Sequence, residues 1–124
     1  MELDDKLKEI DTENFIWVIY IGIIILSWYS NSLEKKYFIY NDIDSKNKYR
    51  MIMIIIFITL VVIYAYFLNG AFKDIKNIDF NHINKNDYLK ILSFIASLLV
   101  FISGIIYLYI LYNDNDIGVE IAFN

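Results

Sequence analysis

Three long stretches of the chain contain no charged residue and are mostly apolar, and polar segments separate them. The stretches are residues 15–33, 51–72 and 91–113, which hold 19, 22 and 23 residues. A helix rises 1.5 Å per residue, so about 20 residues cross the roughly 30 Å hydrocarbon core of a bilayer. Many of these residues are β-branched, but a strand in lipid would leave backbone groups unpaired, so helices are favoured. The pattern predicts three transmembrane helices.

The segment before the first stretch, residues 1–14, is polar and acidic. Within it, Leu3, Leu7 and Ile10 recur at the spacing of one helical face. Acidic residues outnumber the two lysines of this segment. We therefore expect a short amphipathic helix ahead of the first predicted span.

Polar segments of similar size connect the three stretches. Residues 34–50 contain five basic and three acidic residues, and residues 73–90 contain four basic and three acidic residues. We expect both segments to be polar loops. We also expect the second span to continue into residues 73–90 as one or two amphipathic helical turns. Residues 114–124 form an acidic tail without any basic residue.

Aromatic and basic side chains lie near the ends of the predicted spans. Trp and Tyr are enriched at both membrane–water interfaces, and Arg extends its charged group toward the lipid headgroups. These positions are therefore expected to anchor the spans at the interface. The expected anchors are Trp17, Trp28, Tyr29, Arg50, Tyr107, Tyr109 and Tyr112.

The composition supports a membrane protein and excludes several other classes. Hydrophobic residues make up 58% of the 124 residues, which is more than one small soluble core could bury. The chain has no cysteine, so disulfides, thiolate metal sites and cysteine nucleophiles are excluded. Its net charge of −4 argues against binding to nucleic acid, which needs a basic surface. The composition therefore indicates the lipid bilayer as the partner.

Two other interpretations of the pattern stay open. Residues 15–33 could be a secretory signal peptide that is cleaved, although such a peptide begins with basic residues and this chain begins with acidic ones. A soluble helical bundle is the second alternative. Both are less consistent with three separate charge-free stretches than a three-span protein is.

Basic residues are distributed almost evenly between the two sides of a three-span protein. Lys and Arg favour the cytoplasmic side, and the first span usually dominates the orientation. Residues 1–14 have two basic residues and residues 34–50 have five, which favours an outside N-terminus and a cytoplasmic C-terminus. The third span favours the opposite, because residues 73–90 have four basic residues and the tail has none.

The three predicted spans contain no Asp, Glu, Lys, Arg or His. Proton relays, ion-coupled transport and voltage sensing place ionisable residues at membrane depth. The broken helices of transporters need Gly or Pro interruptions, whereas the glycines in these spans are isolated and proline is absent. We therefore expect no enzymatic activity, no catalytic or metal-binding residues and no cofactor.

Small residues gather in the third predicted span, residues 91–113. Small side chains let helix backbones approach closely, and serine can donate a hydrogen bond across the contact. The first interpretation is packing against the chain's own first two spans, and the second is an oligomer interface. The candidate packing residues are Ser93, Ala96, Ser97, Ser103 and Gly104.

A Leu-Glu-Lys-Lys-Tyr segment, residues 33–37, follows the first span, and the second loop is rich in Lys and Asn. Together with three apolar spans, this layout resembles uncharacterised small membrane proteins of low-GC bacteria. The resemblance covers most of the chain, and it implies no known activity.

The sequence thus predicts an all-α integral membrane three-helix bundle, a multi-pass protein of the cell membrane. The expected function is that of a non-enzymatic structural or accessory protein acting through helix–helix contacts, in a homo-oligomer or with another membrane protein. One alternative is a small pore-forming protein of the holin type, although holins usually end in a basic tail. The other alternative is an accessory subunit of a larger membrane transporter complex.

Overall fold

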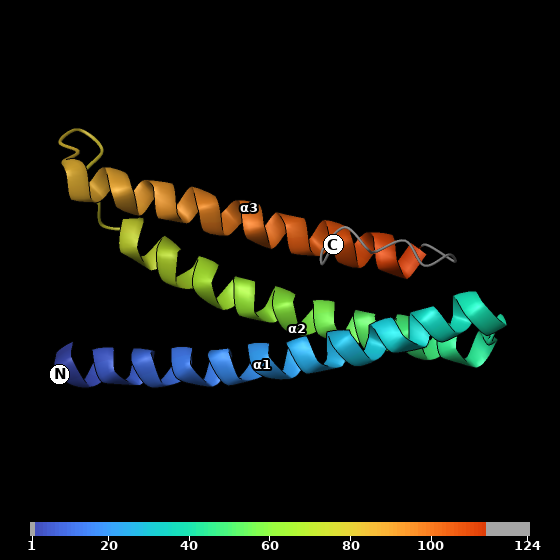
Figure 1. Cartoon of the computed structure of the whole chain (residues 1–124). Coiled ribbons are helices and arrows are strands. Elements are labelled where there is room, and N and C mark those ends of the chain that lie inside the picture. Colours follow the sequence, from blue (N-terminus) through green and yellow to red (C-terminus); the bar gives the residue numbers. More distant parts are fainter. Residues whose placement is uncertain (1, 114–124) are drawn as a thin grey trace. The chain divides into compact units, whose positions relative to one another are not determined.

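The computed structural model describes residues 2–113, and all regular structure among them is α-helical (Figure 1). Helix α1 comprises Glu2–Tyr40, α2 comprises Ile43–Ile75 and α3 comprises Lys85–Asn113. The expected all-α class is therefore confirmed for these residues. By length and composition, all three helices could cross a membrane. The predicted acidic tail, residues 114–124, lies outside the described residues.

The helices are longer than the charge-free stretches on which the prediction was based. Residues 34–50, expected as a polar loop, are helical except at Asn41 and Asp42. Residues 2–14 are not a separate short helix, because α1 continues through them without a break. Lys and Glu are good helix formers, and residues 34–50 contain neither Gly nor Pro, so charge alone does not end a helix there. Charge marks the ends of the apolar stretches, not the ends of the helices.

The chain divides into two compact units, and the boundary between them falls within α2. The first unit is Met1–Ile56 and holds α1 with the start of α2; the second is Phe57–Asn124 and holds the rest of α2 with α3. Each unit has its own helix–helix contact, in which two antiparallel helices lie side by side.

A two-residue turn, Asn41 and Asp42, joins α1 to α2 in the first unit. The Asn41 N–H donates to the Tyr37 carbonyl at 2.7 Å, and the Asn41 backbone is left-handed with φ of 52°. Asparagine tolerates this conformation better than most residues and commonly ends helices in it. Asp42 then caps α2, because its carboxylate accepts hydrogen bonds from the Asp44 N–H at 3.2 Å and the Ser45 hydroxyl at 2.9 Å.

Beyond the turn, the end of α1 packs against the start of α2. The Ser30 hydroxyl is fully buried, donates to the Ser27 carbonyl at 2.8 Å and lies 3.5 Å from the Met53 sulfur. Nearer the turn, the Lys46 ammonium lies 5.4 Å from the centre of the Tyr37 ring. Both contacts join residues equally far from the turn, as an antiparallel helix pair requires. The hydroxyl stays hydrogen-bonded to its own helix, so its burial leaves no donor unpaired.

The second connection is longer and is held by side-chain caps. Helix α2 ends at Ile75, so the expected helical continuation into residues 73–90 stops there. Asp79 accepts a hydrogen bond from the Asn81 N–H at 3.0 Å, and this local turn replaces helical pairing. Asn84 caps α3 by accepting from the Asp87 N–H at 2.8 Å.

The left-handed turn residue predicts a specific effect of substitution. Replacing Asn41 with Ala should lower the free energy of unfolding by about 1 kcal/mol, because a Cβ without a local polar group is disfavoured at positive φ. Asn41→Gly is the control and should be neutral within a few tenths of a kcal/mol. Unfolding in mixed detergent micelles, followed by far-UV circular dichroism, measures both; equal stability of the alanine and glycine variants would contradict the prediction.

Candidate helix-packing site

The second unit contains a close approach of α2 and α3 at Gly104. Gly104 is buried, and a Cβ placed there would lie 3.1 Å from Cδ2 of Tyr64 and 3.2 Å from Cγ2 of Val61. These distances are shorter than ordinary carbon–carbon contacts, so the neighbouring side chains occupy the space that a larger residue would need. Gly104 thus lets the two helices meet closely.

Aromatic pairs flank this point on both sides. The rings of Phe57 and Tyr107 have centroids 5.8 Å apart, and those of Phe72 and Phe94 have centroids 6.1 Å apart. Aromatic rings at such separations contribute roughly 0.5–1.5 kcal/mol beyond the area they bury. The residue numbers rise along α3 as they fall along α2, so these contacts form one antiparallel packing site.

The predicted packing residues fall on two different faces of α3. Gly104 is buried and Ser97 is half-buried, so both lie on the face that carries the contact with α2. Ser93, Ala96 and Ser103 are exposed. The small residues are therefore divided between the α2 contact and an exposed face of α3.

The aromatic and aliphatic partners on α2 were not recognised in the sequence. These residues are Phe57, Val61, Tyr64 and Phe72. On α3, the sequence does indicate which face is packed, because apolar or small residues recur at alternating spacings of three and four. These residues are Phe94, Ser97, Phe101, Gly104, Leu108 and Leu111. All six are buried or half-buried. This alternation marks the packed face of a helix more specifically than small residues alone do.

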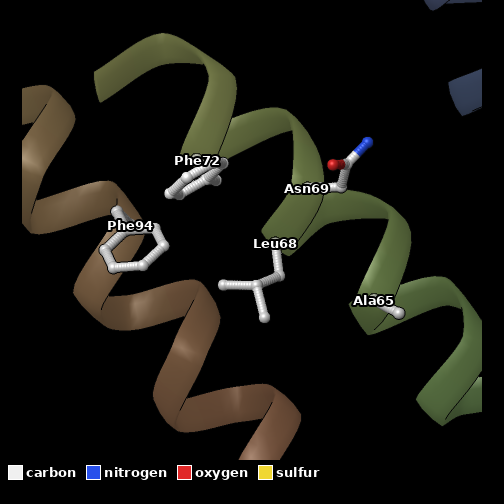
Figure 2. A pocket seen from close by; sticks show the side chains of 5 residues that line it. All are labelled: Ala65, Leu68, Asn69, Phe72 and Phe94. Atoms are coloured by element: carbon white, nitrogen blue, oxygen red, sulfur yellow. The ribbon is translucent and has the colours of Figure 1, made fainter. Parts of the chain in front are cut away.

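An open groove of about 350 Å³ lies beside the packing site (Figure 2). Its lining residues are Ala65, Leu68, Asn69, Phe72 and Phe94. Figure 2 shows Phe72 and Phe94 facing each other, Leu68 directed toward α3, and the Asn69 carboxamide directed away from α3. None of the five side chains is an acid, base or nucleophile. The lining of the groove is thus mostly apolar.

The expected interface anchors lie mostly on outward faces. More than half of the accessible surface is exposed for each of Trp17, Trp28, Tyr29, Tyr109 and Tyr112. Tyr107 differs, because its ring is half-buried and packs with Phe57. Arg50 is half-buried in the first unit. Anchoring at a membrane interface stays a prediction for all seven residues.

A polar cluster lies at the α1–α2 turn and includes Asp42, Ser45 and Lys36. The pKa of Asp42 is lowered from its ordinary 3.8, chiefly because the Ser45 hydroxyl donates to it. Partial desolvation opposes this shift, and the Lys36 ammonium, 3.7 Å from the carboxylate, adds to it. Among residues 2–113, no group of three or more His, Cys, Asp or Glu side chains could hold a metal ion.

The close approach at Gly104 predicts that added volume is costly there. Gly104→Val should unfold with a free energy roughly 1–3 kcal/mol lower than Gly70→Val, because the added methyl groups must displace Tyr64 and Val61. Gly70 is the matched control on α2, since a Cβ there meets nothing within 4 Å. Detergent unfolding of the two variants measures the difference, and identical stabilities would show that the helices do not meet at Gly104.

The Asp42 cluster predicts a pH dependence. A carboxylate whose pKa is lowered in the folded state stabilises that state above pH 3.8, and this contribution is lost as the pH falls through the lowered pKa. Ser45→Ala should move the pKa of Asp42 up toward 3.8, because the largest stabilising hydrogen bond is removed. Carboxyl NMR titration of both proteins measures the pKa; an unchanged value in Ser45→Ala would rule out the hydroxyl as the cause.

Comparisons with known proteins find no match to the chain, whether the comparison is with protein-family models, curated proteins or solved structures. The resemblance to small membrane proteins of low-GC bacteria therefore stays an interpretation of the sequence. The basis for a functional conclusion is the three apolar helices, their packing and the surfaces they leave uncovered.

Proposed function

We propose that the chain is a multi-pass integral protein of the cell membrane, and that it serves as a non-enzymatic structural or accessory component acting through helix–helix contacts. One observation carries the proposal. In the most apolar 18-residue window of each helix, only 22% of α1, 28% of α2 and 6% of α3 is buried within the described chain. Most of the apolar surface is thus available to lipid or to other helices.

The size of this exposed surface supports a membrane location. Exposed large hydrophobic side chains occur along the whole length of all three helices, and Ile24, Val62 and Leu99 each expose more than 60% of their surface. Soluble monomers rarely expose contiguous apolar patches larger than a few hundred Å². In a bilayer the same surface contacts acyl chains, which are as apolar as the side chains themselves.

The exposed face of α3 supports a role in helix–helix contact. Ser93, Ala96 and Ser103 lie on it, and their small side chains would let the backbone of another helix approach. This helix is also the least buried of the three. A membrane protein, either a second copy or a different chain, is therefore the partner that we propose for this face.

Residues 15–33, 51–72 and 91–113 contain no Asp, Glu, Lys, Arg or His, and this supports the non-enzymatic part of the proposal. General acid–base chemistry and ion-coupled transport use such groups at membrane depth. The groove beside the packing site likewise offers apolar contact and one carboxamide.

Cysteine labelling tests the membrane arrangement directly, since the natural chain has no cysteine. We expect single cysteines at exposed Asn47 and Asn81 to react with an impermeant maleimide from opposite sides of sealed membranes, because α2 crosses between them. We also expect the protein to stay in the membrane during carbonate extraction. Labelling of both sites from the same side, or release by carbonate, would overturn the three-span arrangement.

The structural or accessory role is tested by dye retention in vesicles and by purification in detergent. Phosphatidylcholine vesicles containing the protein should retain a trapped fluorescent dye as well as empty vesicles do. Rapid dye leakage would overturn the proposal in favour of a pore. Purification in mild detergent should yield the chain in a complex, with itself or with another membrane protein, and recovery of the monomer alone would count against helix–helix contact as its function.

A further inference from the structure

The first part of α1 carries a regular exposed stripe of apolar residues. Leu3, Leu7 and Ile10 expose 69%, 50% and 51% of their surface. The stripe continues down the helix at alternating spacings of four and three. We call it the outer stripe, and its members are Leu3, Leu7, Ile10, Asn14, Trp17, Ile21, Ile24 and Trp28. All eight are exposed on a single unbroken helix.

This spacing is the heptad pattern of a coiled coil. Within residues 2–14, every position outside the outer stripe is polar or charged. Seven of the eight stripe positions are apolar, and the eighth is Asn14. The heptad pattern therefore begins in residues 2–14, where all other side chains are polar, and it continues into the apolar part of α1.

We propose that a second copy of this chain covers the outer stripe, so that two α1 helices form a parallel, in-register coiled coil. This inference rests on the proposed function, because insertion of both copies in the same orientation makes their α1 helices parallel. The proposal names a second copy as the partner of the outer stripe on α1. The small residues of α3 lie on a different helix and are not part of this interface.

Charge complementarity supports a second copy as the partner. In the heptad set by the outer stripe, Lys6 and Asp11 flank it in the two positions that face each other across a parallel dimer. Both are exposed. Symmetry forms the Lys6–Asp11 pair twice, so the chain is complementary to itself at this surface.

Asn14 supports the same arrangement. It occupies the stripe position at which a buried asparagine pairs with its counterpart, fixes the register and favours two strands at some cost in stability. An in-register parallel pair brings the two Asn14 side chains together. A shifted register would place each carboxamide against an apolar residue, where its hydrogen bonds are lost.

Continuity of the helix argues against the membrane surface as the cover for residues 2–14. An amphipathic helix that binds lipid headgroups lies in the plane of the interface. Helix α1 runs from Glu2 to Tyr40 without a break, and the chain has no proline to kink it. If residues 15–33 cross the bilayer, residues 2–14 project away from it. A second helix is the partner that can follow them.

Disulfide trapping of the full-length chain in phosphatidylcholine vesicles tests the geometry. Single cysteines at Leu7 and Ile10 lie on the outer stripe, and a cysteine at Asp5 lies on the opposite side of the helix as the matched control. Under a mild oxidant we expect several-fold more disulfide-linked dimer from Leu7→Cys and Ile10→Cys than from Asp5→Cys. Equal yields of disulfide-linked dimer at all three positions would overturn the proposal.

Charge reversal tests the pairing. Lys6→Glu and Asp11→Lys should each weaken dimerisation about tenfold, because two attractive pairs become repulsive ones. The double variant restores opposite charges and should recover most of the association, as measured by energy transfer between labelled copies. Failure of the double variant to recover, with both single variants weakened, would show that these residues do not face each other.

The same vesicles separate this inference from the proposed function. A chain that resists carbonate extraction but gives no preferential crosslink on the outer stripe overturns the dimer and leaves the membrane protein standing. A chain that carbonate releases overturns the proposed function, whether or not it dimerises. Preferential crosslinking in carbonate-resistant protein supports both.

Discussion

The dominant physical constraint on this chain is the unfavourable contact of its apolar side chains with water. Its three helices carry more apolar surface than they bury among themselves, and even α2, the most buried, covers little more than a quarter of its most apolar window. In the membrane arrangement proposed above, a bilayer would supply an apolar surrounding for this surface, and helical backbone pairing would remove the remaining cost of polar groups in lipid.

The helix–helix contacts described above each have an identifiable local origin. In the first unit, a two-residue turn sets the antiparallel register, and the contact of Ser30 with Met53 lies within that register. In the second unit, the missing side chain at Gly104 permits the close approach, and aromatic rings pack on either side of it. Small changes of side-chain volume or backbone conformation at these points are therefore expected to lower the free energy of unfolding more than changes elsewhere on the helices.

The sequence was sufficient for the helical class and for the three apolar stretches, because absence of charge over some 20 residues is a long and unambiguous signal. It was insufficient for the helix ends, since Glu34, Arg50 and the lysines of residues 34–50 are good helix formers. Of the five proposed packing residues, Gly104 is buried, Ser97 is half-buried, and Ser93, Ala96 and Ser103 are exposed. Tyr64 and Phe72, which pack against α3, could not be predicted from the sequence. In a uniformly apolar helix, composition does not distinguish a packed face from a lipid-facing one.

The unbroken course of α1 has a consequence for how it could fit a bilayer. A helix of 39 residues is about 58 Å long, which exceeds the roughly 40–45 Å of a bilayer with its headgroups. In a bilayer, such a helix would therefore either tilt or extend beyond the headgroups into water. The polar residues at its two ends, Glu2 and the Asn41–Asp42 turn, would then lie where water can hydrate them.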